Sequence, residues 1–182
     1  MIRVTRFLVA VLFVSLAVAS AHARLGDKLS QLKQRFGPPA PESRKNTALW
    51  FFEAKDGRLA YNVTFNSKGE SIAEGLKPVK LGRLTREMAE DFIQSQIEPY
   101  RNSETLRTVQ PGEKYEFAGQ GLVCGENERV YVDDPNGVLV IWTQGGIPTV
   151  LAVRPEMISG VPPSRGSGRS RSPCRTRRWP AG

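Results

Sequence analysis

The chain has 182 residues, and its 26 Lys and Arg against 18 Asp and Glu give a formal net charge of +8 at pH 7. Its one histidine, His22, lies in a segment predicted to be removed, and its two cysteines are Cys124 and Cys174. The mature chain is therefore expected to lack Ser-His-Asp and Cys-His catalysis, His-ligated zinc or haem, and a four-cysteine metal site.

Residues 1–23 are predicted to form a secretory signal peptide. Arg3 and Arg6 make a positive start, an apolar run follows from residue 7 to residue 18, and Ala21-His22-Ala23 is a small-residue cleavage site. The run is shorter than the roughly 20 apolar residues that a transmembrane helix needs. We expect cleavage after Ala23, a periplasmic or secreted bacterial protein, and no transmembrane segment in the mature chain. An uncleaved N-terminal anchor is the alternative.

The positive charge is concentrated at the two ends of the chain. Two basic residues precede position 24 and six follow position 159, so residues 24–159 contain 18 basic and 18 acidic residues. This span suits one domain, in which about two-thirds of the unfolded surface becomes buried. Residues 160–182 are Ser, Arg, Pro and Gly with few apolar side chains, which predicts a disordered basic tail. We interpret the tail as non-functional, as a frame change would produce. The alternative is a segment that binds nucleic acid or an acidic surface.

The domain is predicted to begin with a short helix. Apolar residues recur from Leu25 to Phe36 at spacings of four, three and four, which places them on one helical face. Asp27 is a candidate N-cap, Gly37 is a candidate left-handed end, and Pro38-Pro39 prevents continuation.

A β-hairpin is predicted next, from Thr47–Ala54 to Leu59–Phe65 around a turn at Asp56-Gly57. This register would pair four residues of each strand on a buried face: Ala54 with Leu59, Phe52 with Tyr61, Trp50 with Val63, and Ala48 with Phe65.

Leu49 and Phe51 then lie on the opposite face, across from Thr64 and Asn62. Cover by another part of the chain is the simpler interpretation. On an open face, Leu49 and Phe51 would be the candidate partner-binding residues.

A second helix, capped by Thr85 and with an apolar stripe from Met88 to Tyr100, is the clearest helical pattern in the chain. Four further strands are predicted after a polar connection, and the last two are apolar throughout, as is typical of the centre of a sheet. The predicted strands after the hairpin are Glu70–Val79, Lys114–Ala118, Glu128–Val132, Val138–Trp142 and Val150–Val153. We predict a single α+β domain, an antiparallel sheet packed by two helices, with loosely duplicated αβββ units.

The remaining side chains allow little chemistry. Glu116 and Glu128 are the one candidate pair for a carboxylate-only hydrolase, if they approach across neighbouring strands. Cys124 is interpreted as a buried small apolar residue. The acidic residues of the second helix are interpreted as a solvated face rather than a metal site. The sequence therefore favours binding over catalysis, with no cofactor and no metal.

The run from Leu25 to Pro39, followed by Leu49-Trp50-Phe51-Phe52 and Tyr61-Asn62-Val63-Thr64-Phe65, resembles small bacterial envelope proteins of the SmpA/BamE and β-lactamase-inhibitor-protein group. Members share a short helix ending in Phe-Gly-x-Pro, then an aromatic strand and a second strand. The chain lacks the acylated Cys of the lipoproteins, and no partner-contacting residue carries over. The resemblance implies a layered α+β fold and a non-enzymatic role, either protein-binding or structural, in the envelope.

Overall fold

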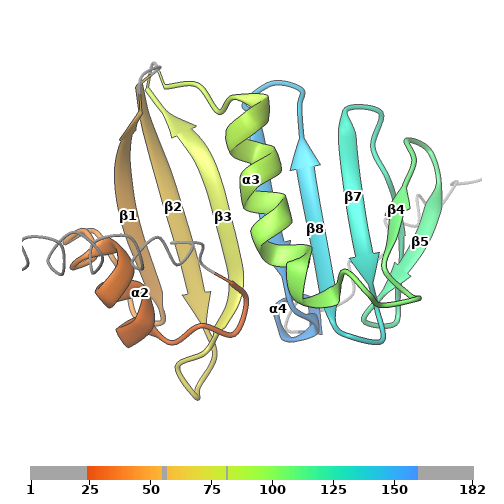
Figure 1. The fold of residues 1–182 in the computed structure, drawn as a ribbon, viewed down its shortest axis with the longest axis horizontal. Coiled ribbons are helices and arrows are strands. Elements are labelled where there is room, and N and C mark those ends of the chain that lie inside the picture. The colour runs from red at the N-terminus through yellow and green to blue at the C-terminus, as the bar shows by residue number, and fades with distance from the viewer. Residues whose placement is uncertain (1–23, 55–56, 81, 160–182) are drawn as a thin grey trace, which may run out of the picture.

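A seven-stranded sheet, in which every pair of neighbours is antiparallel, forms the centre of the protein (Figure 1). The computed structural model describes residues 24–54, 57–80 and 82–159. The strand order is β1-β2-β3-β9-β8-β7-β4, and β5 and β6 form a separate two-stranded sheet. The fold is therefore a single α+β domain built on a mostly antiparallel sheet. The predicted leader, the predicted tail and Cys174 lie outside the described residues.

The helices are α2 (Leu29–Phe36), α3 (Arg86–Ile97), the 3₁₀ turn η1 (Glu98–Tyr100) and α4 (Pro155–Ser159). The strands are β1 (Thr47–Ala54), β2 (Gly57–Phe65), β3 (Ser71–Val79), β4 (Arg107–Val109), β5 (Lys114–Phe117), β6 (Gln120–Val123), β7 (Glu128–Asp133), β8 (Val138–Thr143) and β9 (Thr149–Val153).

The β1–β2 hairpin has the predicted faces but a different register. Ala54 pairs with Gly57 rather than with Leu59, so the two strands are paired two residues away from the predicted alignment. Gly57, predicted to lie in the turn, is the first residue of β2, and Asp56 lies outside the described residues. Because side chains alternate with a period of two, a shift of two residues leaves every side chain on its predicted face. Trp50 and Tyr61 now pair directly, and both are buried.

Helix α2 begins later than predicted. Its N-cap is Lys28, and Leu25 is buried outside the helix. Gly26 has φ +97°, a conformation that ends any continuous helix from Leu25. The predicted N-cap role of Asp27 is therefore wrong: its carboxylate accepts from the Arg24 backbone N–H instead. Gly37 does follow the helix with a positive φ of +77°, although its ψ of −169° lies outside the left-handed helical region.

Helix α3 begins as predicted, because Thr85 Oγ1 accepts the Met88 backbone N–H at 3.2 Å. Pro99 lies in the 3₁₀ turn that ends it. Ala89 and Ile93 of α3 and Leu32 of α2 belong to one buried cluster on one face of the sheet, which we call the front face (Figure 1). Burying a side chain such as Ile93 contributes about 1.5–3 kcal/mol.

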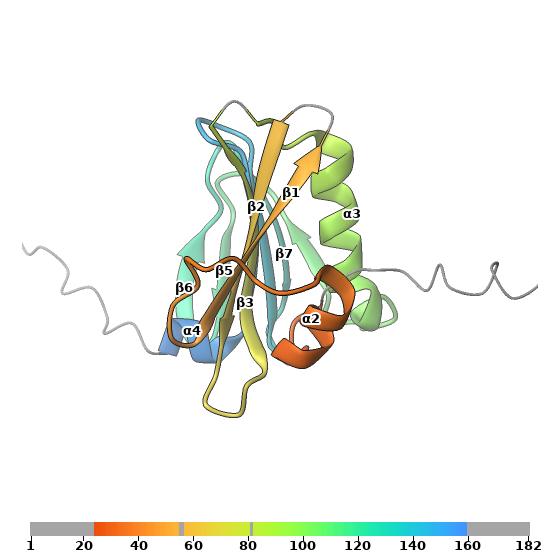
Figure 2. The same cartoon turned by 90° about the vertical axis from the view of Figure 1, so that its left-hand side faces the viewer.

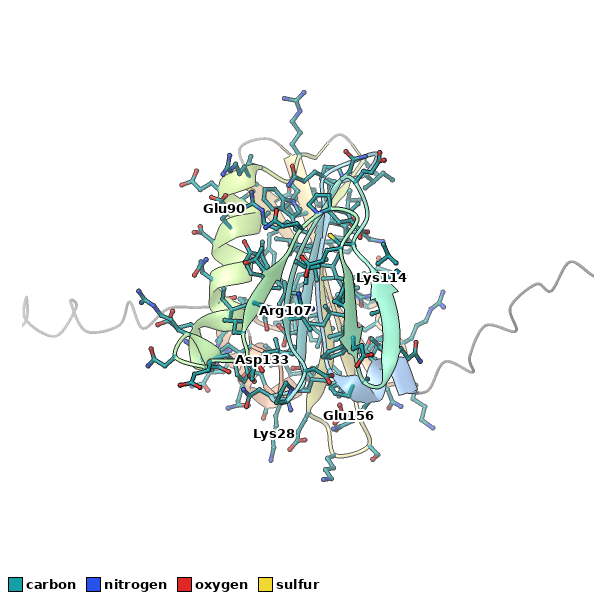
Figure 3. All side chains as sticks on the ribbon, turned by 90° about the vertical axis from the view of Figure 1, so that its right-hand side faces the viewer. Lys28, Glu90, Arg107, Lys114, Asp133 and Glu156 are labelled. Atoms are coloured by element: carbon teal, nitrogen blue, oxygen red, sulfur yellow. The ribbon has the colours of Figure 1, made fainter. Side chains whose placement is uncertain are left out.

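On the back face, the β5–β6 hairpin and α4 cover one half of the sheet. Figure 3 shows α3, with Glu90, on one side of the sheet, and the hairpin with Lys114 and α4 with Glu156 on the other. A second buried cluster lies beneath this cover, and it includes Phe117, Cys124 and Val130. The predicted burial of Cys124 is confirmed.

Strands β8 and β9 lie inside the sheet, as their apolar sequences predicted. Three short elements were not predicted: β4, β6 and α4. β4 lies in the predicted polar connection, and β6 lies in a segment, residues 119–125, that contains three glycines.

Candidate functional site

One row of directly paired residues crosses the back face and passes from an open to a covered surface. Directly paired residues of neighbouring strands share a face. In order across the sheet, the row is Leu49, Asn62, Gly75, Leu151, Ile141 and Val130. Leu151 is 37% exposed, whereas Val130 is fully buried beneath the β5–β6 hairpin. At this level of the sheet the back face is therefore open from β1 to β9, whereas nearer α4 it is covered from β3 onward, where Ala73 is buried.

A groove of about 560 Å³ lies on this open part of the back face. Leu49, Phe51, Ala60 and Val79 provide its apolar side chains, and both predicted partner-binding residues line it. Leu49 and Phe51 are each partly buried, so neither of them is an ordinary core residue. The structure thus brings the two predicted residues together at one surface. The residues paired with them are Asn62 and Ala60, rather than the predicted Thr64 and Asn62.

The connection between α2 and β1 borders the groove on one side. Figure 2 shows this connection crossing the edge of β1 from the helix side of the sheet to the back. It is held there because the Ala40 N–H donates to the Leu49 carbonyl at 2.7 Å, and the Leu49 N–H donates to Ser43 Oγ at 3.1 Å. The simpler sequence interpretation, cover by another segment, is therefore met by this connection at the edge of β1 and by α4 over β3, and neither segment closes the groove beside Leu49 and Phe51.

The connection protects part of the edge of β1 and leaves the rest open. Backbone groups of alternate residues point toward the same edge of a strand. Since those of Leu49 point outward, those of Phe51 and Glu53 do too. Among the described residues, no backbone group hydrogen-bonds to Phe51 or Glu53 at that edge.

The rim of the groove contains cations. Arg44 and Lys77 line it together with Glu42. Within the described part of the chain, no carboxylate lies within ion-pair distance of Arg44 or Lys77. The guanidinium of Arg58, which pairs with Glu53, lies 5.3 Å from the centre of the Phe51 ring. An apolar floor with a largely cationic rim suits an apolar group flanked by carboxylates.

The front face holds a buried carboxylate, Glu74, within the predicted strand Glu70–Val79. Glu74 of β3 is completely buried. It accepts hydrogen bonds from Tyr61 at 2.8 Å, Ser71 at 2.7 Å and Gln96 Nε2 at 2.9 Å. These donors come from β2, β3 and α3, so Glu74 joins three elements beneath the helices.

Burial raises the pKa of the Glu74 carboxyl, because desolvation disfavours the charged form more than its three donors favour it. Burial and the neighbouring Glu74 likewise raise the pKa of the Tyr61 phenol. The network has no open approach, since both side chains are buried. We therefore assign it to the architecture of the front face.

The predicted acid pair is not brought together across neighbouring strands. Glu116 is on β5, which pairs with β6, and Glu128 is on β7, which pairs with β4 and β8. The two side chains line different hollows, of about 680 and 500 Å³. The carboxylate of Glu128 accepts the Gly125 N–H at 2.9 Å. The condition set for a carboxylate-only hydrolase, an approach of Glu116 and Glu128 across neighbouring strands, is therefore not met.

Within residues 24–54, 57–80 and 82–159, no three His, Cys, Asp or Glu side chains gather closely enough to hold a metal ion. None of the helices in that part of the chain combines the length and apolarity needed to cross a bilayer. Comparison with family models, curated proteins and solved structures found no match for this chain.

Proposed function

We propose that this chain is an exported, non-enzymatic protein of the bacterial envelope that binds a partner protein through the open back face of β1–β3. One observation carries the proposal: along a single row of paired residues, the back face changes from partly buried at Leu49, exposed at Asn62 and 37% exposed at Leu151 to fully buried at Val130. Apolar groups such as Leu49 and Phe51 on a bordered, open face are typical of an interaction site.

The edge of β1 suggests how the partner binds. An extended segment can add to an open strand edge through main-chain hydrogen bonds, while alternate side chains enter pockets beside that edge. The outward backbone groups of Phe51 and Glu53 provide such an edge next to the groove. The cations Arg44 and Lys77 favour a segment with carboxylates beside its apolar side chain.

We also propose that the fold is a duplicated αβββ unit with one helix packed on each half. The order β1-β2-β3 is mirrored by β7-β8-β9, and the two units meet where β3 pairs with β9. Helices α2 and α3 each precede one set of three strands and contribute to the same front cluster. A distant relationship to the SmpA/BamE and β-lactamase-inhibitor-protein group is part of this proposal, and the helix, Gly-Pro and hairpin pattern supports it.

The first test compares two double variants of the mature protein. Leu49→Asp with Phe51→Asp places carboxylates in the groove. Val123→Asp with Ile147→Asp is the matched control, because these apolar side chains are 59% and 71% exposed elsewhere on the surface. Each variant is incubated with synthetic peptides that have one apolar residue flanked by Glu, and with the same peptides in which Lys replaces Glu.

We expect the parent and the control to bind the Glu peptides more tightly than the Lys peptides. We expect the groove variant to lose that binding while keeping a cooperative thermal transition. Equal binding by all three proteins contradicts the proposed site. Unfolding of the groove variant alone would show that Leu49 and Phe51 are core residues.

A further inference from the structure

The first residues after the predicted cleavage site are built into the fold. Leu25 is only 9% exposed, and its N–H donates to Gln96 Oε1 at 3.0 Å. The Gly26 N–H donates to the Ser71 carbonyl at 2.9 Å, and the Ser71 N–H donates to the Asp27 carbonyl at 2.9 Å. The chain is therefore fixed against β3 and α3 within two residues of position 23.

Two further contacts close around this segment. The Arg154 guanidinium, from the residue after β9, donates to the Leu25 carbonyl at 3.2 Å. A Cβ atom at Gly26 would lie 2.8 Å from Arg154 Nη2, and Gly26 has a positive φ, so the close approach requires glycine. Ser71 and Gln96, which hold the segment, also donate to the buried Glu74 carboxylate. The start of the domain is thus continuous with the front-face network.

The Arg24 nitrogen has a specific acidic partner. It lies 3.0 Å from Asp27 Oδ2, which also accepts from the Arg35 guanidinium. In the precursor this nitrogen is a neutral amide. Hydrolysis of the Ala23–Arg24 bond consumes one water and leaves a carboxylate on Ala23 and an α-ammonium group on Arg24. A hydrogen bond from a charged donor to a carboxylate is roughly twice as strong as one between neutral groups.

We infer that processing after Ala23 completes the fold, because the new Arg24 α-ammonium group pairs with Asp27 and fastens the segment that begins the domain. This inference rests on the proposed export of the chain. It also sets an order: proteolysis needs a locally open chain, so cleavage precedes docking of Leu25 and Gly26.

The test starts from the full precursor, expressed with its leader in a bacterial envelope, and the N-terminus of the purified product is determined by mass spectrometry. The purified product is then compared with two chains of the same C-terminus. One begins with an extra Ala before Arg24, and the other begins at Arg24 and is acetylated there. Both changes replace the α-ammonium group with an amide.

We expect the product to begin at Arg24. Each amide-bearing chain should have an unfolding equilibrium constant about two- to fivefold larger than that of the product. In the Asp27→Asn background, the extension and the acetyl group should change nothing further. In a Glu126→Gln background, the amide-bearing chains should still show an unfolding constant about two- to fivefold larger, because Glu126 is exposed and lines a hollow that does not include Asp27.

The outcomes separate the inference from the export on which it rests. A product that retains Met1 overturns the inference, and it overturns export as well only if that product stays in the cytoplasm. In a second outcome, the product begins at Arg24 and the amide-bearing chains are destabilised by the same amount with and without Asp27→Asn. That result overturns the pairing and leaves export intact. If Asp27→Asn does not fold, the salt dependence of stability is the test. The stability difference between the product and the amide-bearing chains should shrink between about 0.05 and 1 M NaCl. A difference that stays constant overturns the pairing.

Discussion

The two halves of the sheet share a front layer but differ at the back. β1–β3 and β7–β9 are mirrored sets of three strands, and side chains from both contribute to the front cluster beneath α2 and α3. Behind β7–β9, the β5–β6 hairpin and α4 bury a second cluster. Among the described residues behind β1–β3, α4 packs against β3, where Ala73 is buried, and the connection from α2 reaches around the edge of β1 (Figure 2). The back face is therefore covered most fully behind β7–β9 and least behind β1 and β2, where the groove lies.

The largest expected effect tests the covered half. Phe117 is fully buried beneath the hairpin, so Phe117→Ala leaves a cavity and should lower the free energy of unfolding by about 3–5 kcal/mol. Urea denaturation at neutral pH measures the change. A loss of less than about 1 kcal/mol would show that the hairpin is not a stabilising cover.

A second prediction concerns the front layer, where β3 of one half meets β9 of the other. The pKa of Glu74 is raised in the folded chain, so its contribution to stability is present below its ordinary pKa of 4.5 and is lost as pH rises through the raised value. From pH 4.5 upward, parent stability should therefore fall by up to about 1.4 kcal/mol per pH unit from this group. Glu74→Gln should remove that slope.

The matched control for this titration is Glu126→Gln, which changes an exposed carboxylate. It should keep the slope of the parent. Urea midpoints measured between pH 4.5 and 7 decide the matter, and parallel curves for the parent and Glu74→Gln would contradict the assigned titration.

A smaller effect is expected on the open part of the back face. Phe51→Ala removes a partly buried ring from the groove and should cost about 1 kcal/mol or less, much below the loss at Phe117. The same urea assay measures both variants. Equal losses at the two positions would remove the distinction between an open and a covered back face.

The smallest effect is expected at Gly75, in the row that crosses the open face. A Cβ atom there would lie 3.4 Å from Leu151 Cδ1, which is ordinary contact, so Gly75→Ala should change stability by about 0.5 kcal/mol or less. Gly26→Ala is the control, because Gly26 has a positive φ and faces Arg154, and it should cost more. A large loss at Gly75 in thermal unfolding would indicate that the back face is tightly packed there.

Sequence patterns predicted the long elements because these carry their own periodicity. Thr85 marked the start of α3, and the apolar runs marked β8 and β9 as central. The hairpin faces were correct although its register was not, because pairing shifted by two residues preserves the faces. The start of α2 was wrong because Leu25 matches the helical spacing although it lies outside the helix; Gly26 was the available signal.

The short elements and the open face could not be predicted in the same way. β4 has three residues, and its pairing with β7, such as Val109 with Val130, is distant in sequence. β6 pairs with its neighbour β5, but its four residues include a glycine and show no clear alternation. Leu49 and Phe51 were identified by their unusual face. Whether that face stays open depends on where the β5–β6 hairpin packs, and this is a property of the whole chain.

The most direct measurement is photo-crosslinking in the living bacterial envelope. A benzophenone amino acid replaces Phe51 in the groove or, as the control, the 59% exposed Val123 on β6. The account predicts a defined adduct with a second protein from position 51 and none from position 123. Adducts of the same pattern from both positions, or none from position 51, would contradict the assignment of the open back face as the partner surface.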